Sequence, residues 1–358
     1  MNSWPHSGPT APDPSPARSL RVVAIGGGTG LSTLLKGLKR YAQPGGGAYR
    51  PVHAEIERLC AVVTVSDDGG SSGRLRKEFN MLPPGDIRNC IVALSQDEAL
   101  LSRLFQHRFQ TGAGLEGHNF GNLFLAALTS ITGDFSEAVR LSSEILLTRG
   151  HIFPATTSNV ELEAQMEDGS IVRGETKITA SKGRIQELTL VPGDVPPLPE
   201  TLDAIACADL ITIGPGSLFT SLIPNLLVRG IPRAISESKA LKVYVCNLMT
   251  QANESLGLTA ADHVRALNRH AQTQLFDYAL INRVPASEEM KAKYALEGAS
   301  QIEADVDAIE HLGVQPLLGD YLEEAGVARH ATDKVADDLM ELAVCGGRPS
   351  AVPVRSRS

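Results

Sequence analysis

The feature that most constrains this fold is a glycine cluster between a strand-like and a helix-like stretch. Residues Leu20 to Ile25 form an uninterrupted apolar run, typical of a strand buried on both faces of a parallel sheet. Gly26-Gly27-Gly28-Thr29-Gly30 follows, and leucines then recur at helical spacing on one face, at positions 31, 34, 35 and 38. A second apolar run covers Cys60 to Val65. This order predicts an α/β fold with a Rossmann-like, doubly wound, mainly parallel sheet.

The pattern is interrupted and then resumes further along the chain. Apolar and polar residues alternate from Val160 to Glu167, Asp168-Gly169 forms a turn, and a second extended run reaches Ile178. We therefore expect residues 151–195 to form a small β-hairpin excursion. Parallel strands are again predicted at Ala208 to Ile213, Leu241 to Asn247 and Tyr278 to Asn282. We expect a disordered Pro/Ser-rich tail over residues 1–19, one α/β nucleotide-binding domain over 20–344, and a flexible tail over 345–358.

Charge and composition disfavour several classes of function. The net charge of -8 and the few aromatic residues, 4% of the chain, argue against nucleic-acid binding. No apolar run approaches the ~20 residues that span a bilayer. The five cysteines are scattered without a CxxC pair, which fits a cytoplasmic protein rather than a disulfide framework or a zinc site. The long apolar helices predicted in the middle of the chain make a homodimer plausible.

Two glycine-rich loops are candidate phosphate-binding sites. The first is Gly26 to Gly30, where a helix N-terminus and converging backbone amides can hold an anion. The second follows an apolar strand at Gly214-Pro215-Gly216-Ser217. The dinucleotide fingerprint is incomplete because Leu31 stands at its third glycine, and there is no Walker lysine. The second loop does not match GxSxG, so Ser217 is not read as an acylated nucleophile. Two such loops predict a diphosphate held from both sides, although each could also be only a tight turn.

A pair of carboxylates follows the second predicted strand. Asp67 and Asp68 lie among glycines, with Ser71 and Arg74 shortly after them as phosphate-compatible donors. Such carboxylates can hold Mg²⁺ through their oxygens, or accept a proton from a substrate hydroxyl. The structural alternative is a solvated turn in which an aspartate caps the next helix. Asp67 and Asp68 are therefore candidate catalytic residues, and candidate metal ligands only if the protein depends on Mg²⁺.

Two further motifs carry polar side chains at predicted helix starts. Leu82-Pro83-Pro84-Gly85 is a rigid loop that leads into Asp86, Arg88 and Asn89; structural and ligand-binding roles are equally favoured for these three. Gly117-His118-Asn119-Phe120-Gly121-Asn122 precedes an apolar helix. His118 is a candidate proton shuttle or phosphate donor, although a lone histidine is more often a scaffold residue. Asn119 and Asn122 are candidate ligand-binding residues beside it.

Together these motifs resemble the bacterial gluconeogenesis factor family, the YvcK-like proteins. The resemblance rests on VVAIGGGTGLSTLLKGLK, AVVTVSDDGGSSGRLR, LPPGDIRNC, GHNFGNLFLAAL and TIGPGSLFTSLIPNLLV, and it extends from about Leu20 to Leu342. More distantly, the chain is similar to the 2-phospho-L-lactate transferases of deazaflavin cofactor synthesis. The Pro-rich N-terminal extension departs from the family pattern.

The resemblance implies a function that composition alone does not give. It implies binding of UDP-N-acetylglucosamine and a role in growth on gluconeogenic carbon sources, in cell shape and in wall synthesis, with wall-synthesis proteins as partners. It also implies that Tyr294 and Arg329 contact the nucleotide sugar. The alternative is a transferase that uses a nucleoside diphosphate-linked donor, with Mg²⁺ as its cofactor. NAD-dependent redox chemistry is disfavoured, because an acid is missing about 20 residues after the first loop.

Overall fold

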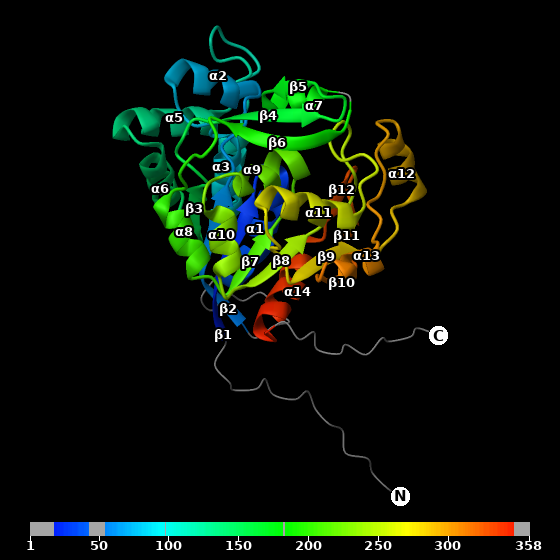
Figure 1. Ribbon diagram of the computed structural model, residues 1–358. Coiled ribbons are helices and arrows are strands. Elements are labelled where there is room, and N and C mark those ends of the chain that lie inside the picture. The colour runs from blue at the N-terminus through cyan, green and yellow to red at the C-terminus, as the bar shows by residue number, and fades with distance from the viewer. Residues whose placement is uncertain (1–17, 43–53, 97, 182, 347–358) are drawn as a thin grey trace, which may run out of the picture.

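The computed structural model describes residues 18–42, 54–96, 98–181 and 183–346 (Figure 1). At its centre is a seven-stranded sheet, in the order β10-β9-β8-β7-β1-β2-β3, in which all neighbouring strands are parallel. The prediction of a Rossmann-like α/β fold is confirmed. Its strands are β1 (Arg18–Gly26), β2 (Ala54–Val63), β3 (His151–Pro154), β7 (Leu210–Ile213), β8 (Leu241–Val245), β9 (Tyr278–Asn282) and β10 (Gln315–Gly319).

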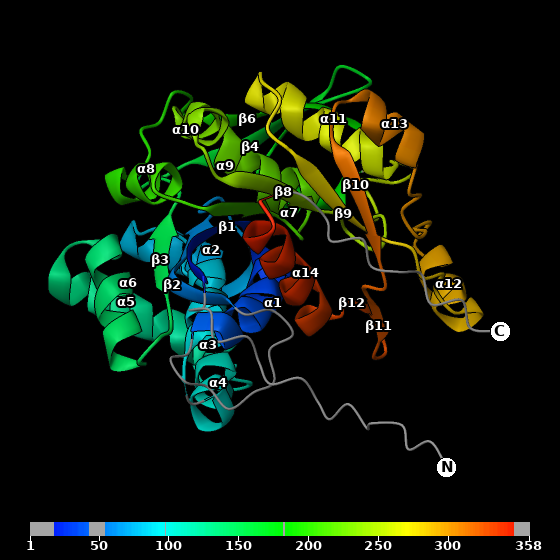
Figure 2. The same ribbon diagram turned by 90° about the horizontal axis from the view of Figure 1, so that it is seen from below.

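Helices cover both faces of this sheet. Figure 2 shows α1, α3 and α14 on one side, and α8, α10, α11 and α13 on the other. The helices are α1 (Gly28–Lys39), α2 (Gly70–Phe79), α3 (Gly85–Leu94), α4 (Glu98–Gln106), α5 (Phe120–Thr132), α6 (Phe135–Ile145), α7 (Glu175–Ala180), α8 (Pro199–Ala206), α9 (Ile223–Leu226), α10 (Ile231–Glu237), α11 (Ala260–Ala271), α12 (Glu288–Ala295), α13 (Val306–His311) and α14 (Thr332–Val344). A 3₁₀ turn (Arg40–Ala42) follows α1 and a π-helical turn (Leu218–Leu222) precedes α9.

The strand order reverses next to β1. The chain winds outward from β1 through β2 to β3, and then returns to pair β7 with the other side of β1. In doubly wound sheets a crevice opens at such a reversal, outside the carboxyl ends of the strands. The residues Val22 to Ile25 of β1 are almost fully buried and anchor this part of the core. The loops after β1 and β7, which are the two glycine-rich loops, therefore lie on either side of the crevice.

Several predicted boundaries differ from the structure. β1 starts at Arg18, so the last two residues assigned to the disordered tail belong to the sheet. The segment His151–Pro154 is not part of the excursion, because it pairs with β2 as the edge strand β3. β10 and the hairpin of β11 (Leu322–Glu324) and β12 (Ala328–His330) were not expected. These short strands are partly exposed and carry polar residues, which hides their apolar pattern.

The excursion is a three-stranded antiparallel sheet in the order β5-β4-β6, with β4 at Glu161–Met166, β5 at Ile171–Arg173 and β6 at Ile185–Val191. The predicted hairpin turn at Asp168-Gly169 is correct. The second extended run is wrong beyond Arg173, because Glu175–Ala180 forms α7. In Figure 1 this small sheet and α7 lie above the carboxyl ends of the central strands. The excursion thus covers part of the edge at which ligands bind.

Two predictions fall partly outside the described residues. These are the tail before residue 18 and the tail after residue 346. Within the described ranges, no helix is long and apolar enough to cross a membrane.

Candidate functional site

A cavity of about 310 Å³ opens in the crevice between the carboxyl ends of β1 and β7. We call it the Gly-loop cavity. The two predicted phosphate loops both contribute to its wall, and none of the described residues that line it is charged. The lining residues are Gly27, Gly28, Thr29, Gly30, Pro215, Gly216, Ser217, Ser221, Asn247, Leu248, Met249, Thr250, Gln251, Tyr294, Ala328 and His330.

The first loop presents backbone N–H groups at the start of α1. Gly27 is the N-cap residue, no side chain caps the helix, and its first turn has no acidic residue. Apart from the Gly28 N–H, which donates to Asp86, the amides of this first turn and the helix dipole favour an anion at this end of the cavity. Gly28 has a φ of +61°, which disfavours any side chain. A Cβ at Gly30 would lie 2.3 Å from the Pro215 carbonyl oxygen, so glycine is needed there for the two loops to touch.

The second loop is held by side chains from the segment after β8. Asn247 accepts from the Gly216 N–H at 2.9 Å and donates to the Gly216 carbonyl at 2.7 Å. The Gln251 amide donates to the Ser217 hydroxyl at 2.9 Å. The buried carboxylate of Glu254 accepts from the N–H groups of Phe219 and Thr220. These five hydrogen bonds hold the second loop in place.

The far wall comes from α12 and β12. Tyr294 lines the cavity, and its hydroxyl accepts the Ala328 N–H at 3.2 Å. His330 donates from Nε2 to the Cys246 carbonyl at 3.0 Å, and burial lowers the pKa of His330 to about 4. The ring is therefore neutral at pH 7, with Nδ1 left as an acceptor. Arg329 points to the other face of β12 because neighbouring strand residues alternate; it is exposed and outside the lining.

A second polar group lies at the carboxyl end of β2. We call Asp67, Asp68, Asp86 and Glu175 the carboxylate cluster. Asp67 accepts from the Gly69 N–H at 2.9 Å, and Asp68 accepts from both the N–H and the hydroxyl of Thr176 in α7. The Asp68 bonds fasten the excursion to the central sheet. Burial, followed by the charges of the other three carboxylates, raises the pKa of Glu175 to about 9.

Asp86 connects this cluster to the Gly-loop cavity. Its carboxylate accepts a hydrogen bond from the Gly28 N–H, and a Cβ at Gly27 would lie 2.9 Å from its Oδ2. Burial and the charge of Asp67 raise the pKa of Asp86 to about 6, against the lowering effect of the Gly28 hydrogen bond and of Arg88. Asp86 thus lies beneath the first loop and positions it, rather than lining the cavity.

The other predicted residues gather around the carboxylate cluster. The His118 Nδ1 lies 3.1 Å from the Ser71 hydroxyl, which also accepts the Asn119 N–H. Burial and Arg74 lower the pKa of His118. The Asn119 side chain is the N-cap of α5. Arg74 itself donates to the Glu116 carbonyl and has no carboxylate partner among the described residues.

Arg88 is hydrogen-bonded to two amide side chains. Its guanidinium donates to the side-chain oxygens of Asn89 and Asn122, and its Nε has no partner among the described residues. Within those same residues, no three His, Cys, Asp or Glu side chains converge as a set of metal ligands. The predicted residues therefore form two groups, one at the Gly-loop cavity and one at the carboxylate cluster. Asp86 connects them through its hydrogen bond with the Gly28 N–H of the first loop.

Sequence reasoning missed part of the cavity. Asn247, Gln251 and His330 were not singled out. Asn247 is the last residue of a predicted strand, so the rule that found both glycine loops could have found it. Gln251 lies on an irregular segment and His330 ends the short strand β12, and neither has a sequence pattern that points to the site. Gly26 and Gly214, which were predicted to bind ligand, precede the lining residues; Gly26 is the last residue of β1.

Comparison with known proteins supports this picture. A model of the 2-phospho-L-lactate transferase CofD family matches residues 22–322, which include both glycine loops and the carboxylate cluster. The chain belongs to the CofD family. Proteins of one family share a fold, and the loops that carry the motifs of this chain lie within the matched residues.

CofD-family relatives of known name are similar over most of the chain. The gluconeogenesis factor of Halalkalibacterium halodurans is 49% identical over 322 residues, 89% of this chain and 95% of that protein. The gluconeogenesis factor of Bacillus subtilis is 47% identical, over 90% and 98% of the two chains. A crystal structure of a family protein from Bacillus halodurans superposes with a TM-score of 0.84 at 47% identity, covering 90% of this chain and all of that one. The chain is thus of the gluconeogenesis factor type.

Proposed function

We propose that this chain binds a nucleoside diphosphate sugar, UDP-N-acetylglucosamine, in the Gly-loop cavity and acts as a non-catalytic sensor. The observation that carries the proposal is that the loops after β1 and β7 line one cavity. The first loop offers backbone N–H groups at the start of α1, the second adds the Ser217 hydroxyl, and Gly30 lets the two loops touch, so a diphosphate fits between them. The cavity is open and near the lower end of ligand-site volumes, so the sugar extends beyond it.

The neutral wall suits the remainder of such a ligand. The Tyr294 ring and the free Nδ1 of His330 offer an apolar surface and an acceptor for a base N–H or a ribose hydroxyl. The names of the relatives support a role in growth on gluconeogenic carbon sources. Within this proposal, the protein reports the supply of the sugar nucleotide to wall-synthesis proteins and so influences cell shape.

One observation favours a second candidate function. The carboxylate cluster lies beside the cavity, and in a transferase Asp67 and Asp68 would hold Mg²⁺ against the diphosphate while a carboxylate accepts a proton from the acceptor hydroxyl. Family membership in CofD supports this alternative. Against this alternative, Asp68 already accepts hydrogen bonds from Thr176, and Asp86 accepts one from the Gly28 N–H.

Calorimetric titration separates the two functions. The purified protein is titrated with UDP-N-acetylglucosamine, UDP, GDP and NAD, in Mg²⁺ and again in EDTA, and each mixture is assayed for released nucleoside monophosphate. A sensor binds UDP-N-acetylglucosamine with the same affinity in both buffers and releases nothing. Binding that requires Mg²⁺, together with nucleoside monophosphate release, overturns the sensor and supports the transferase.

A further inference from the structure

A second cavity, of about 660 Å³, lies between α11 and β6. We call it the arginine cavity, because Arg184, Arg265 and Arg269 line it. The helix and the strand are neighbours in Figure 1, and the Arg269 guanidinium donates to the Gln186 carbonyl of β6. The volume is about twice that of the Gly-loop cavity and lies within the range of small-molecule sites.

Part of the lining of the arginine cavity is apolar. Phe219, Ile185 and Ala266 belong to it and are buried in the protein, with exposed fractions of 3%, 7% and 9%. Leu256 and Leu258 extend this apolar part and are half-buried. An apolar lining with a few polar groups is typical of a site that binds an organic molecule.

Two of the three arginines have no carboxylate partner among the described residues. Arg265 forms an ion pair with Asp262 at 2.6 Å, whereas Arg269 donates to a backbone carbonyl. The Arg184 side chain has neither a hydrogen bond nor an ion pair within the described ranges. Glu167 is an exposed acid of the same lining and also lacks an ion pair there. Two arginines against one glutamate favour an anion, and guanidinium groups bind phosphate and carboxylate oxygens well.

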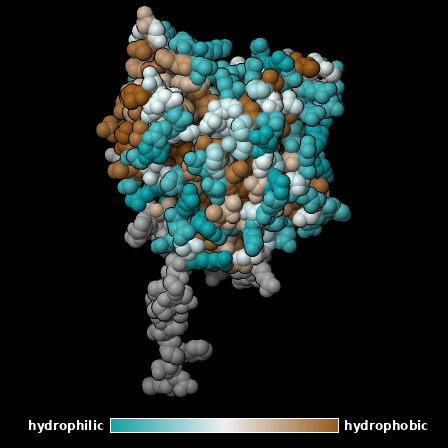
Figure 3. All heavy atoms as spheres, turned by 60° about the vertical axis from the view of Figure 1, so that its left-hand side comes forward, coloured by the Kyte–Doolittle hydropathy of each residue, from teal (hydrophilic) through white to brown (hydrophobic). Residues whose placement is uncertain are grey.

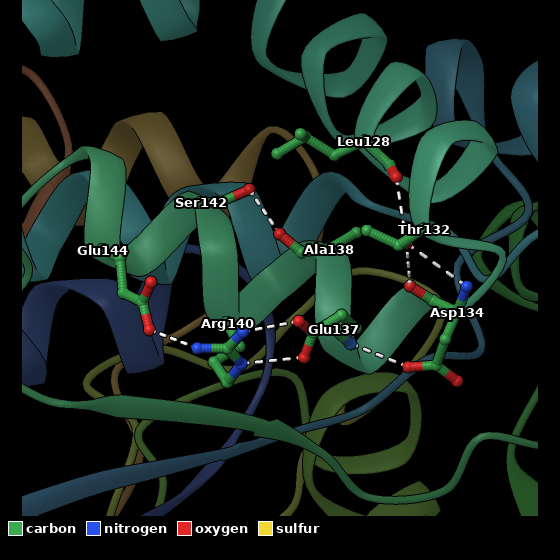
Figure 4. A network of polar contacts seen from close by, with 8 residues as sticks. All are labelled: Leu128, Thr132, Asp134, Glu137, Ala138, Arg140, Ser142 and Glu144. Carbon is green, nitrogen blue, oxygen red and sulfur yellow. Dashed lines mark hydrogen bonds and ion pairs between the residues drawn. The ribbon is translucent and has the colours of Figure 1, made fainter.

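Two other parts of the surface lack this combination. Figure 3 shows apolar residues gathered at its upper left, at the height of α5 in Figure 1, but α5 contains no charged residue. A cavity of about 720 Å³ between α6 and β3 is lined by an arginine, Arg140. That guanidinium pairs with both Glu137 and Glu144 (Figure 4), so its charge is already balanced within the protein.

The arginine cavity shares two stretches of chain with the Gly-loop cavity. Residues 247–251 line the Gly-loop cavity, and the turn after them contributes Glu254 to the arginine cavity. The π-helical turn before α9 gives Ser221 to the Gly-loop cavity and Phe219 to the arginine cavity. Glu254 joins the two stretches, because its Oε1 accepts the Phe219 N–H at 2.7 Å. A ligand in the arginine cavity therefore touches residues that hold the second glycine loop.

We propose that the arginine cavity binds a small organic anion with an apolar body, and that this ligand raises the affinity of the Gly-loop cavity for its own ligand. Arg184 and Arg269 hold the anion, and the apolar body lies on Phe219. The cavity is present in the conformation in which Glu254 holds the second loop, so a ligand that fits it stabilises that conformation. Such a coupling is reciprocal. The site is independent of the proposed function, whereas the coupling rests on it.

Titration of the full chain with phenyl phosphate, followed by phosphorus NMR, tests the site. Phenyl phosphate combines a dianion with an aromatic ring, and a ligand of this size should bind with a dissociation constant of about 4 mM. Methyl phosphate lacks the ring and benzyl alcohol lacks the charge, so each should bind at least about tenfold more weakly. Equal binding of either compound overturns the proposed ligand class.

Arginine variants assign the binding to this cavity. Arg184→Gln with Arg269→Gln should weaken phenyl phosphate at least about tenfold. Arg184→Gln alone breaks no hydrogen bond or ion pair of the described chain, and should weaken it about threefold. Arg233→Gln is the matched control, because it makes the same change at a side chain on α10 that is 80% exposed. Gly28→Val should leave phenyl phosphate binding unchanged, since the anion does not occupy the Gly-loop cavity. Circular dichroism checks that each variant folds.

The site is overturned if phenyl phosphate fails to bind at up to about 20 mM. Binding that is lost in Gly28→Val but kept in the double arginine variant also overturns it, because the phosphate then lies in the Gly-loop cavity.

The coupling is measured by titrating UDP-N-acetylglucosamine with and without phenyl phosphate at about 20 mM. The affinity should rise about fivefold in the wild type and stay unchanged in the double arginine variant. An unchanged or lower affinity in the wild type overturns the coupling. If UDP-N-acetylglucosamine does not bind at all, the proposed function fails, and the phenyl phosphate titrations still decide whether the arginine cavity is a site.

Discussion

The Gly-loop cavity and the carboxylate cluster are neighbours with opposite chemistry. The described lining of the cavity holds no charged side chain, and its anion-binding groups are backbone amides at the start of α1. The cluster brings four carboxylates together, and burial, followed by the charges of the other three, raises the pKa of Glu175 to about 9. A diphosphate is favoured in the first region and repelled by the second, at ~1 kcal/mol per charge pair at 4 Å in water. We therefore infer that the diphosphate binds in the cavity and not at the carboxylate cluster. Asp86 connects the two regions, because it contacts Gly28 and lies near Asp67.

Among these variants, Gly28→Val should cause the largest loss of ligand affinity, because Gly28 belongs to the first loop of the Gly-loop cavity. The residue has a φ of +61°, and a β-branched side chain strongly disfavours that conformation. The loop must then move its amides, and affinity for UDP-N-acetylglucosamine should fall more than about 100-fold, or ~2.7 kcal/mol. Isothermal titration measures the loss. Gly133→Val is the control, because Gly133 has a φ of +72° at the end of α5, away from the cavity. Equal affinities in folded Gly28→Val and wild type would remove the first loop from the site.

His330→Leu should weaken binding by about tenfold, the worth of one lost hydrogen bond. Leucine keeps an apolar wall but removes the Nδ1 acceptor. His330→Gln is the matched variant, since its amide can both donate to the Cys246 carbonyl and accept from a ligand. Competition titration should show partial recovery in His330→Gln. If leucine and glutamine behave alike, His330 serves only as part of the wall.

Asp67→Asn with Asp68→Asn should have a smaller effect on the sensor, a loss of affinity of about threefold. In the sensor these residues accept hydrogen bonds from sugar or ribose hydroxyls and from Thr176, and amide oxygens can replace carboxylates in part. Titrations in Mg²⁺ and in EDTA measure the change. A loss of affinity of more than about 100-fold, seen only in Mg²⁺, would indicate that the ligand's phosphates bind at the carboxylate cluster.

Glu175→Gln should change stability more than binding. The folded chain keeps the Glu175 proton up to a pKa of about 9, whereas the unfolded chain releases it near the ordinary glutamate pKa of 4.5. The folded state therefore binds more protons between those values, and its stability falls as the pH rises. Glutamine has no proton to lose, so the variant should melt about 2 °C higher than the wild type at pH 8, with little difference at pH 5. Glu288→Gln, at an exposed position, should change neither melting temperature. A lower melting temperature of Glu175→Gln at pH 8 would contradict a protonated Glu175.

The sequence predicted those parts of the site that follow from local rules. Both glycine loops were found because each ends an apolar strand, and carboxyl ends of parallel strands meet at one edge. Asp67 and Asp68 were found in the same way. The contact of Asp86 with the Gly28 N–H joins residues from different elements, and no local pattern predicts such a contact.

The errors in the fold also have physical causes. The excursion was predicted to extend to Ile178, but Glu175 to Ala180 form a helix whose first turn bonds to Asp68, a tertiary contact that overrides alternation. β3 has four residues and ends in Pro154, too short for a periodic signal. Arg329 was placed in the site by resemblance alone, and the alternation of β12 turns its side chain away from the cavity wall.

Amide hydrogen exchange with and without UDP-N-acetylglucosamine tests the central claim most directly, because it reads both regions in one measurement. If one diphosphate is held by the two loops, amides of residues 27–31 and 216–222 should exchange more slowly with ligand, and by a larger factor than amides of residues 67–74. Protection confined to residues 67–74, or protection of only one glycine loop, would contradict a ligand held between β1 and β7.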